Sequence, residues 1–455
     1  MTSPSAGAPR KLMVAGLLSS ALEWYDFFIY GTAAALVFGK LFFPNVSGPV
    51  GILAAFATFW AGFIARPIGG VILGSLGDRI GRKPVLLISL VMMAAATILI
   101  GLLPTAATVG ILAPALLVLL RFAQGIAVGG QWGGVVLLLT ESAGPRHRGR
   151  AGTFGQMGAP LGFVIGSLVF IVVSFSTTTE QFQAWGWRIP FLASILLVPI
   201  VLFIHYRIED SPEFRKLQEA GEKKEVVEAA PVRELLRTNL RRVLTCAGLL
   251  FACNAMSYVI MTGVLAYGVN HLSMNRSELL TVALVAAIGM IITVYLSGAA
   301  SDRYGRRPVI IVGAVLVCLW TFPFFWLVDT GNIWLVATAS IIGFSLAGIT
   351  FGPVAAFVAE LFPPRLRFSG ATLAYQTSAI LVSGSTPFIM TALIEATGGT
   401  AAVSGFLLAM ALVTLGSAVV LPETLPARGG DLTVSGRGGR QGMPQGGTET
   451  VLPHA

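Results

Sequence analysis

The sequence contains little charge. Only 11% of its 455 residues are Asp, Glu, Lys or Arg, whereas an ordinary soluble domain carries about 25%. Hydrophobic residues make up 55% of the chain, and the mean hydropathy is +0.81. A chain of this length with so few charges cannot cover a water-exposed surface, so the composition excludes a soluble enzyme. It also excludes intrinsic disorder outside the chain ends.

Cysteine and histidine are scarce as well. The three cysteines lie inside apolar runs, which excludes a disulfide framework, and we interpret them as small hydrophobic residues. The four histidines lie at or beyond the ends of apolar runs, so no intramembrane zinc site is expected. The nucleotide-binding pattern G-x4-G-K-[ST] is absent. We therefore expect no catalytic residues, no metal and no cofactor, and a receptor is the alternative to a transporter.

Long apolar runs dominate the sequence. A membrane-spanning helix needs about 20 mainly apolar residues, and twelve such runs occur. They lack the period-two alternation of a transmembrane β-barrel. The sequence thus predicts an all-α integral membrane protein with twelve transmembrane helices. The runs cover residues 12–38, 50–76, 85–103, 113–139, 151–175, 188–206, 243–270, 279–300, 309–328, 333–358, 369–394 and 401–421.

The basic residues indicate how the chain crosses the membrane. They concentrate at both chain ends and in every second connection, whereas the remaining connections hold only Lys40 and Arg276. The positive-inside rule then places both termini in the cytoplasm. A cleaved signal peptide in the first run is the alternative, but losing one span would destroy this asymmetry. The net charge of +9 is therefore a topology signal, and we expect no nucleic-acid partner.

One long charged connection divides the runs into two sets of six. The C-terminal tail, which follows the twelfth run, is rich in glycine, proline and polar residues, and this composition predicts disorder. We expect a cytoplasmic N-terminus (1–11), an N-terminal six-helix bundle (12–206), a central cytoplasmic linker (207–242), a C-terminal six-helix bundle (243–421) and a disordered cytoplasmic tail (422–455).

The two halves repeat one another. Residues 74–85 (GSLGDRIGRKPV) match residues 298–309 (GAASDRYGRRPV) at an offset of 224 residues. Each copy follows the second run of its half. The pattern E-x3-P-R-x-R also occurs twice, after the fourth run of each half, beginning at Glu141 and Glu360. A duplicated six-helix unit with a site between its halves is typical of secondary transporters.

These motifs carry a family resemblance. The turn G-x3-D-R-x-G-R-[KR] resembles the signature loop of the major facilitator superfamily, and Arg121-x2-Gln124-Gly125 resembles its second motif. Four segments resemble the metabolite–proton symporter family: residues 21–31, 65–69, 129–134 and 185–191. The residue patterns of the last two segments are most similar to the shikimate-like branch of that family. The resemblance covers residues 12–424. Relatives often carry Glu where this chain has Gln131, and osmosensing betaine carriers have a coiled-coil tail that this chain lacks.

The resemblance implies the major facilitator fold and transport by alternating access. The implied function is proton-coupled uptake of a small organic acid or a related polar metabolite across the inner membrane of a bacterium. The implied partners are the substrate, the proton and the lipid bilayer, and we expect a monomer. Two alternatives within transport are a proton-coupled carrier of zwitterions such as proline or betaine, and an efflux carrier of the same superfamily.

Four charged residues lie inside runs of the first half: Glu23, Asp26, Arg66 and Arg121. A charge at bilayer depth is costly and needs a functional reason. In the second half, every charge between Leu244 and Ala359 is expected in a connecting loop. We therefore predict proton coupling in the first half, on Asp26 and Glu23, and the resemblance gives Arg121 a role in proton relay. A static Asp–Arg pair that locks spans together is the alternative.

The arginines are also candidates for substrate recognition, because a guanidinium group binds a carboxylate through two parallel hydrogen bonds. Their alternative role is to balance the two acids. Arg188, which follows two tryptophans, is interpreted as an interfacial anchor. The predicted substrate-binding residues are Tyr25, Arg66, Arg121, Gln124, Gln131 and Trp132 in the first half and Asn254, Tyr258, Tyr375 and Gln376 in the second.

The repeated turns suggest a gate. Acidic and basic side chains at the cytoplasmic helix ends can form ion pairs that hold the inner face closed, and Gly77, Gly81 and Gly305 are expected to permit the tight turns. A static topology signal is the alternative. The predicted gating residues are Asp78, Arg79, Arg82, Lys83, Glu141, Asp302, Arg303, Arg306, Arg307 and Glu360.

Overall fold

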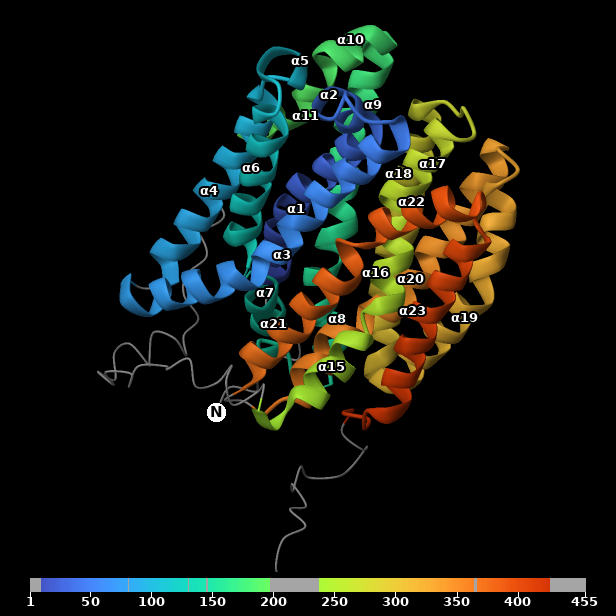
Figure 1. The fold of residues 1–455 in the computed structure, drawn as a ribbon. Coiled ribbons are helices and arrows are strands. Elements are labelled where there is room, and N and C mark those ends of the chain that lie inside the picture. The colour runs from blue at the N-terminus through green and yellow to red at the C-terminus, as the bar shows by residue number, and fades with distance from the viewer. Residues whose placement is uncertain are drawn as a thin grey trace, which may run out of the picture. The chain divides into compact units, whose positions relative to one another are not determined.

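A computed structural model describes residues 10–80, 82–129, 131–144, 146–196, 237–363 and 366–425. Within these ranges every regular element is a helix, and most helices run alongside one another (Figure 1). The predicted linker, apart from its last residues 237–242, and the tail from residue 426 onward lie outside the described residues.

The first half consists of four described segments that are long and apolar enough to cross a membrane, a shorter apolar one between the second and the fourth, and the start of a sixth. Several segments combine two or three consecutive helical elements, because short π-helical or 3-10 turns interrupt them. The elements are α1 (Arg10–Ala33), the π-helix η1 (Ala34–Phe38), α2 (Gly39–Phe42), α3 (Gly48–Ile80), α4 (Arg82–Leu102), α5 (Ala106–Val109), α6 (Leu112–Val128), α7 (Gln131–Glu141), α8 (Arg148–Gln156), α9 (Gly158–Ser176), α10 (Thr179–Ala184), the 3-10 helix η2 (Gly186–Arg188), α11 (Ile189–Ala193) and the 3-10 helix η3 (Ser194–Leu196).

The second half follows the same plan. Its first and fifth segments contain π-helical turns, as the first segment of the chain does. The elements are α15 (Leu240–Gly248), α16 (Phe251–Tyr258), the π-helix η4 (Val259–Gly263), α17 (Val264–Asn270), α18 (Arg276–Tyr304), α19 (Arg306–Val328), α20 (Ile333–Leu361), α21 (Arg367–Ser378), the π-helix η5 (Ala379–Ser383), α22 (Thr386–Thr397) and α23 (Ala401–Val420).

Ten helical segments in the described ranges are long and apolar enough to cross a membrane. They coincide with ten of the twelve predicted runs. The predicted third span corresponds to α4, whose described apolar part, Ile88–Leu102, is shorter. The predicted sixth span begins at α11 and continues into residues beyond 196, which lie outside the described ranges. The prediction of an all-α membrane protein is confirmed.

The internal repeat recurs in the geometry. α3 ends at Ile80 and α4 begins at Arg82, while α18 ends at Tyr304 and α19 begins at Arg306. Both turns therefore fall at the same offset of 224 residues. Gly305 fills the second turn with φ +103°, a conformation that side chains disfavour, and a Cβ there would lie 2.7 Å from the Glu423 carboxylate. Gly77, in contrast, lies within α3 rather than in the turn, so it is not one of the turn glycines.

Between Leu244 and Ala359 the charged residues lie in helix ends rather than in loops, except for Asp329, which follows α19. This corrects the prediction. Arg276 occupies the first turn of α18 and Arg303 its last turn, while Arg306 opens α19. The helices extend past the apolar runs because Arg, Glu and Lys are good helix formers. The middle turns of the described helices in this half carry no charged residue, as expected.

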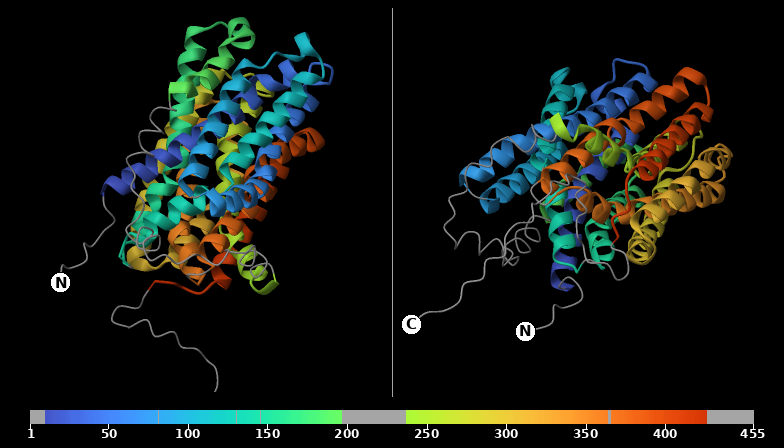
Figure 2. Two further views of the ribbon diagram at one scale, coloured as in Figure 1. Left: turned by 90° about the vertical axis from the view of Figure 1, so that its left-hand side faces the viewer. Right: turned by 90° about the horizontal axis from the view of Figure 1, so that it is seen from below.

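The two halves contact each other toward both ends of their helices. α1 contacts η4 and η1 contacts α17, while α3 packs against η5 and α22. Nearer the turns that carry the repeat, α7 and α8 pack against α20, and α8 also packs against α18. Figure 2 shows the first half (blue to green) and the second half (yellow to red) from two further directions. We call the end that carries Asp302 and Arg306 the basic end.

Candidate functional site

Four charged side chains gather inside the first half, as the sequence predicts. Glu23 and Asp26 lie on α1, Arg66 on α3 and Arg121 on α6. Their exposed fractions are 7%, 4%, 1% and 0%, in that order. We call these four residues the charged cluster. Charges so fully removed from solvent are costly unless they have partners.

The arginines of the charged cluster have few hydrogen-bond partners. Arg121 Nη1 donates to Gln124 Oε1 at 3.1 Å, and Gln124 Nε2 donates to Thr97 Oγ1 at 2.7 Å. The Nε and Nη2 groups of both Arg66 and Arg121 have no hydrogen-bond partner in the structure. These open N–H groups can receive an acceptor that is not part of the chain.

Aromatic rings surround the two guanidinium groups instead. The Arg66 guanidinium carbon lies 4.1 Å from the ring centroid of Phe27 and 4.3 Å from that of Phe63. The Arg121 guanidinium carbon lies 4.1 Å from Phe27 and 4.4 Å from Tyr30. The negative face of an aromatic ring attracts a cation, most strongly where water is excluded. The rings therefore stabilise the buried cations without neutralising them.

The acids of the charged cluster are likewise not locked into ion pairs. Asp26 Oδ1 has no hydrogen-bond partner. The polar groups that act on Asp26 are the Thr97 hydroxyl and the Arg121 charge, while the Arg66 charge acts on Glu23. Among the described residues, neither acid has an arginine nitrogen within the 4.0 Å of a salt bridge. The alternative of a static Asp–Arg ion pair is thus not the arrangement in this structure.

Two of the predicted binding tyrosines have different surroundings. The Tyr25 hydroxyl donates to the Pro190 carbonyl at 2.7 Å and so ties α1 to α11. The Tyr258 hydroxyl is buried without a partner, and its ring lies 5.9 Å from the rings of Phe59 and Phe63. Tyr258 is therefore a polar group of the second half that lies beside the charged cluster. Asn254 donates to Ser378 Oγ at 2.9 Å within the second half.

Three other predicted binding residues make contacts between the halves. The Trp132 and Tyr375 rings stack with centroids 4.0 Å apart, and Gln376 Nε2 donates to the Gly129 carbonyl at 2.9 Å. Trp132 Nε1 donates to Gln156 Oε1 at 2.9 Å. Gln156 Nε2 in turn donates to the Phe351 carbonyl at 3.3 Å. We call Gly129, Trp132, Gln156, Phe351, Tyr375 and Gln376 the plug.

The plug connects α6, α7 and α8 of the first half with α20 and α21 of the second. Gln156 was not predicted as a site residue. Its amide side chain lies in a span of otherwise small and apolar residues, and this contrast could have indicated a buried hydrogen-bonding role. Gln131 begins α7, but its side chain lies outside the described part of the chain.

At the basic end, Asp302 joins the halves. Its two carboxylate oxygens accept the backbone N–H groups of Gly149 and Arg150 at 2.8 Å each, where α8 begins. A carboxylate at a helix N-terminus satisfies unpaired donors and the helix dipole. Arg306 Nη1 donates to the same carboxylate at 2.5 Å, and Arg306 Nη2 lies 3.4 Å from Glu360 Oε1.

Two further contacts complete the basic end. Arg367 of the second half pairs with Glu141 of the first at 3.0 Å. Glu423, which was not predicted, accepts the backbone N–H groups of Arg306 and Arg307 at 2.9 Å each. The first backbone N–H groups of a helix such as α19 lack partners within the helix, so an acidic side chain that accepts them could have been expected.

The remaining predicted gating residues contribute less to these contacts. Arg303 is exposed and has the Tyr304 ring as its neighbour, and Arg307 donates to the Val419 carbonyl at 2.7 Å. The side chains of Asp78, Arg79, Arg82 and Lys83 lie outside the described part of the chain. Arg188 donates to the carbonyls of Gly101 and Leu103 at 2.7 and 2.6 Å, so it caps the end of α4.

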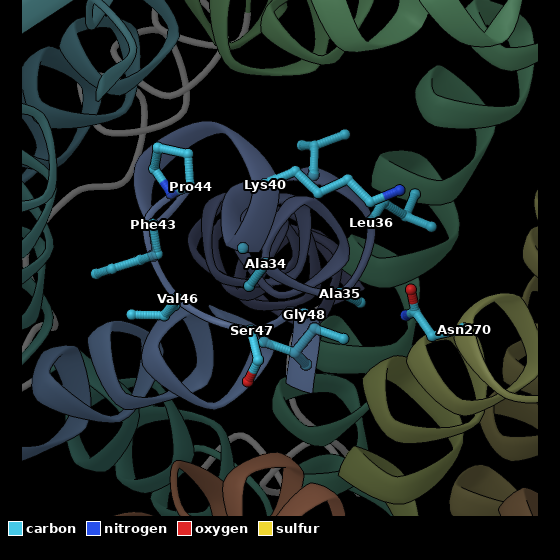
Figure 3. A pocket seen from close by; sticks show the side chains of 13 residues that line it. Ala34, Ala35, Leu36, Lys40, Phe43, Pro44, Val46, Ser47, Gly48 and Asn270 are labelled. Carbon is cyan, nitrogen blue, oxygen red and sulfur yellow. The ribbon is translucent and has the colours of Figure 1, made fainter. Parts of the chain in front are cut away.

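A pocket of about 230 Å³ lies at the end of the bundle opposite the basic end. η1, the loop after α2 and Asn270 of α17 line it, so both halves contribute (Figure 3). Lys40 supplies its one charged side chain. Figure 3 shows the Lys40 amine and the Asn270 amide at the same side of this pocket.

Comparison with known proteins places the chain in a family. Residues 12–385 match the Major Facilitator Superfamily. The chain is 40% identical over 420 residues to the inner membrane metabolite transport protein YhjE of Escherichia coli (strain K12), covering 91% of this chain and 94% of that protein. It is 38% identical over 427 residues to the shikimate transporter of the same strain, covering 92% and 96%.

A third relative and a solved structure agree with this placement. The chain is 33% identical over 423 residues to the proline/betaine transporter of Salmonella typhimurium, covering 92% of this chain and 84% of that protein. The xylose transporter XylE of E. coli, in a partially occluded inward-open conformation, superimposes with a TM-score of 0.70 at 18% identity, covering 92% and 99%.

The chain belongs to the major facilitator superfamily. It is a multi-pass membrane transporter and not an enzyme, as the sequence predicts. The likeness to XylE confirms the predicted major facilitator fold.

Proposed function

We propose that the protein is a proton-coupled symporter that takes up a small organic anion by alternating access. The observation that carries this proposal is the state of the charged cluster. It holds two buried cations with open N–H groups and a buried carboxylate, Asp26, with an open oxygen. The open groups can accept an anion and a proton at adjacent positions.

Charge balance links the two ligands. A carboxylate that binds the arginines adds a negative charge to a site of low dielectric, where an unbalanced charge is costly. A proton on Asp26 offsets this added charge. The loaded cluster then carries the same net charge as the empty one, so anion and proton are most stable when they are bound together.

A zwitterion substrate such as proline or betaine is the second candidate, because one relative is a proline/betaine transporter. A quaternary ammonium group is commonly bound by aromatic ring faces. Here the guanidinium groups already lie over Phe27, Phe59 and Phe63. The cluster thus favours an acid, such as the shikimate named for another relative.

The contacts between the halves suggest how access alternates. We propose that the basic end faces the cytoplasm of a bacterial cell, with both termini on that side of the inner membrane. The contacts of Asp302, the Glu141–Arg367 pair and the plug then close the inner face. These contacts break when the inner face opens, and the contacts of η1, η4 and η5 at the other end form a separate outer closure.

The experiment is uptake into proteoliposomes under an imposed proton gradient, screened across organic acids, proline and betaine. We expect accumulation of an acid that collapses when the gradient is removed. Asp26→Asn should abolish accumulation but retain exchange of substrate across the membrane. Full accumulation by Asp26→Asn would remove Asp26 from the mechanism, and accumulation of an ammonium compound alone would favour the second candidate.

A further inference from the structure

The ring of Phe27 is shared by both arginines of the charged cluster. Each guanidinium carbon lies 4.1 Å from its centroid, and Phe27 is 1% exposed. Among the described residues, no other ring contacts both groups. The further rings around Arg66 are Trp24 and Phe63, and those around Arg121 are Tyr30 and Phe59.

This arrangement has an electrostatic consequence. Two guanidinium groups in a dry site repel each other, and each is attracted to the nearby carboxylate of Glu23 or Asp26. An ion pair with those acids would use up the N–H groups of the arginines and the oxygens of the acids. A ring face attracts the same cations but accepts none of their charge and consumes no carboxylate oxygen.

We propose that Phe27 is a positioning residue of the coupling site. Its ring holds Arg66 and Arg121 away from the two acids, which leaves Asp26 free to exchange a proton and the arginines free to bind an anion. The inference rests on the proposed function of Asp26. Phe27 directly follows Asp26 on α1, so any movement of α1 displaces the ring and the carboxylate together.

Several titratable and polar groups lie in and around the charged cluster, and Phe27 acts against this fixed background. Besides Arg121, Tyr25 on the same helix and Thr97 on α4 interact with Asp26. Tyr30 on α1, Arg66 on α3 and Tyr258 on α16 interact with Arg121. Gln124 on α6 accepts a hydrogen bond from Arg121, and Glu23 on α1 completes the cluster.

The competing explanation is that Phe27 only fills space, and the neighbouring residue provides a matched control. Phe28 is 3% exposed and contacts the rings of Phe163 and Tyr258 but no guanidinium group. Phe28→Leu therefore removes a buried ring of the same size one residue further along α1. Phe27→Tyr keeps a ring face at position 27 and serves as the rescue variant.

The test is an infrared pH titration of the purified, full-length protein, which follows the protonated carboxyl band without any substrate. Loss of that band in Asp26→Asn assigns it to Asp26. In Phe27→Leu, Arg121 approaches the carboxylate and stabilises its charged form, so the midpoint moves to lower pH by about one unit, a tenfold change in proton affinity. Phe28→Leu and Phe27→Tyr should keep the midpoint of the original protein.

A second series of variants separates the loss of the ring face from a change in folding. Stepwise fluorination of the phenylalanine at position 27 weakens the ring face at nearly constant size, and the midpoint should fall with each added fluorine. Equal midpoints in Phe27→Leu and Phe28→Leu, with no trend on fluorination, overturn the inference alone. If Asp26→Asn leaves the whole carboxyl band unchanged, with no part of it lost, the proposed role of Asp26 is overturned and the inference with it.

Discussion

The charged cluster and the plug are both buried, but they differ in how many of their polar atoms have hydrogen-bond partners. In the plug, the polar nitrogens of Trp132, Gln156 and Gln376 all donate to a partner, and Gln376 Oε1 is its one buried side-chain polar atom without a partner. In the charged cluster, Arg66, Arg121 and Asp26 each keep open polar atoms. A buried polar group without a partner costs about 1–3 kcal/mol. Groups that are left open at this cost are candidates for ligand binding, whereas satisfied groups hold the structure together.

The same comparison extends to the two halves. Among the described residues, the charges buried in the middle turns of helices all belong to the first half, whereas the buried charge of the second half, Arg306, lies at the start of α19. The second half instead contributes Tyr258 to the charged cluster and Asp302 and Arg306 to the basic end. The two halves therefore share the sequence of the repeated turn but differ in the charged residues inside their helices. The charged cluster lies in the first half, whereas both halves contribute to the contacts at the basic end.

The largest effect is expected at Arg121. Arg121→Gln removes a buried cation that the proposed function assigns to the substrate carboxylate. Hydrogen bonds to charged groups contribute about 1.5–3 kcal/mol, so affinity for an acid should fall about 10-fold to 100-fold. The measurement is substrate-induced thermal stabilisation in detergent, with the melting temperature of the empty protein as the folding control. Unchanged affinity in a folded variant would contradict the contrast between open and satisfied groups.

The next effect concerns the basic end. Asp302→Asn weakens the contacts with Gly149, Arg150 and Arg306, so the inner face should open more often and net uptake should slow several-fold. Labelling of a single introduced cysteine near the plug, in a background without the three native cysteines, reports this opening. Arg303→Gln is the matched control because Arg303 is exposed and has no described ion pair. Equal labelling rates in Asp302→Asn and Arg303→Gln would contradict the gating role of Asp302.

A smaller effect is expected within the plug. Trp132→Phe keeps an aromatic ring against Tyr375 but removes the hydrogen bond that orients Gln156 toward the Phe351 carbonyl of the second half, and a hydrogen bond is worth about 1 kcal/mol. The rate of inward opening should rise about fivefold, while substrate affinity should change little. If affinity falls as much as it does in Arg121→Gln, Trp132 binds substrate, as the sequence alone suggested, and the division between plug and charged cluster is wrong.

The smallest effect is expected at Lys40 in the outer pocket. Lys40→Gln removes the one charge there, and exposed charges mainly influence the rate of encounter. KM for an acid should rise about twofold at low ionic strength and become equal to the KM of the unmodified protein at high salt. A change that persists at high salt would indicate a direct binding role instead.

Much of this architecture follows from the sequence. Apolar runs of sufficient length identify the spans, and the repeat at residues 74–85 and 298–309 identifies the two halves because one turn geometry demands the same residues twice. The four buried charges are visible for a similar reason, since Glu23, Asp26, Arg66 and Arg121 interrupt apolar runs. Composition and spacing therefore identify both the fold and the atoms that carry charge.

The partners of these charges could not be predicted. Phe27 and Phe28 look equivalent in the sequence, yet only Phe27 contacts both arginines, because the difference lies in the rotation of α1 against α3 and α6. Trp132, Tyr375 and Gln376 have the residue types of a binding site, but Trp132 stacks on Tyr375 and Gln376 donates to the Gly129 carbonyl, both across the halves. Contacts between segments more than 200 residues apart depend on packing that a local pattern does not contain.

The most direct measurement is the number of protons taken up when an acid substrate binds. Calorimetric titrations of the purified protein in buffers of different ionisation enthalpy give this number without any membrane gradient. At a pH where Asp26 is largely ionised, we predict uptake of about one proton per substrate by the unmodified protein, because the bound anion requires a compensating charge in a dry site. Asp26→Asn should bind the substrate with no proton uptake. Binding without proton uptake by the unmodified protein, or equal uptake by Asp26→Asn, would contradict the account.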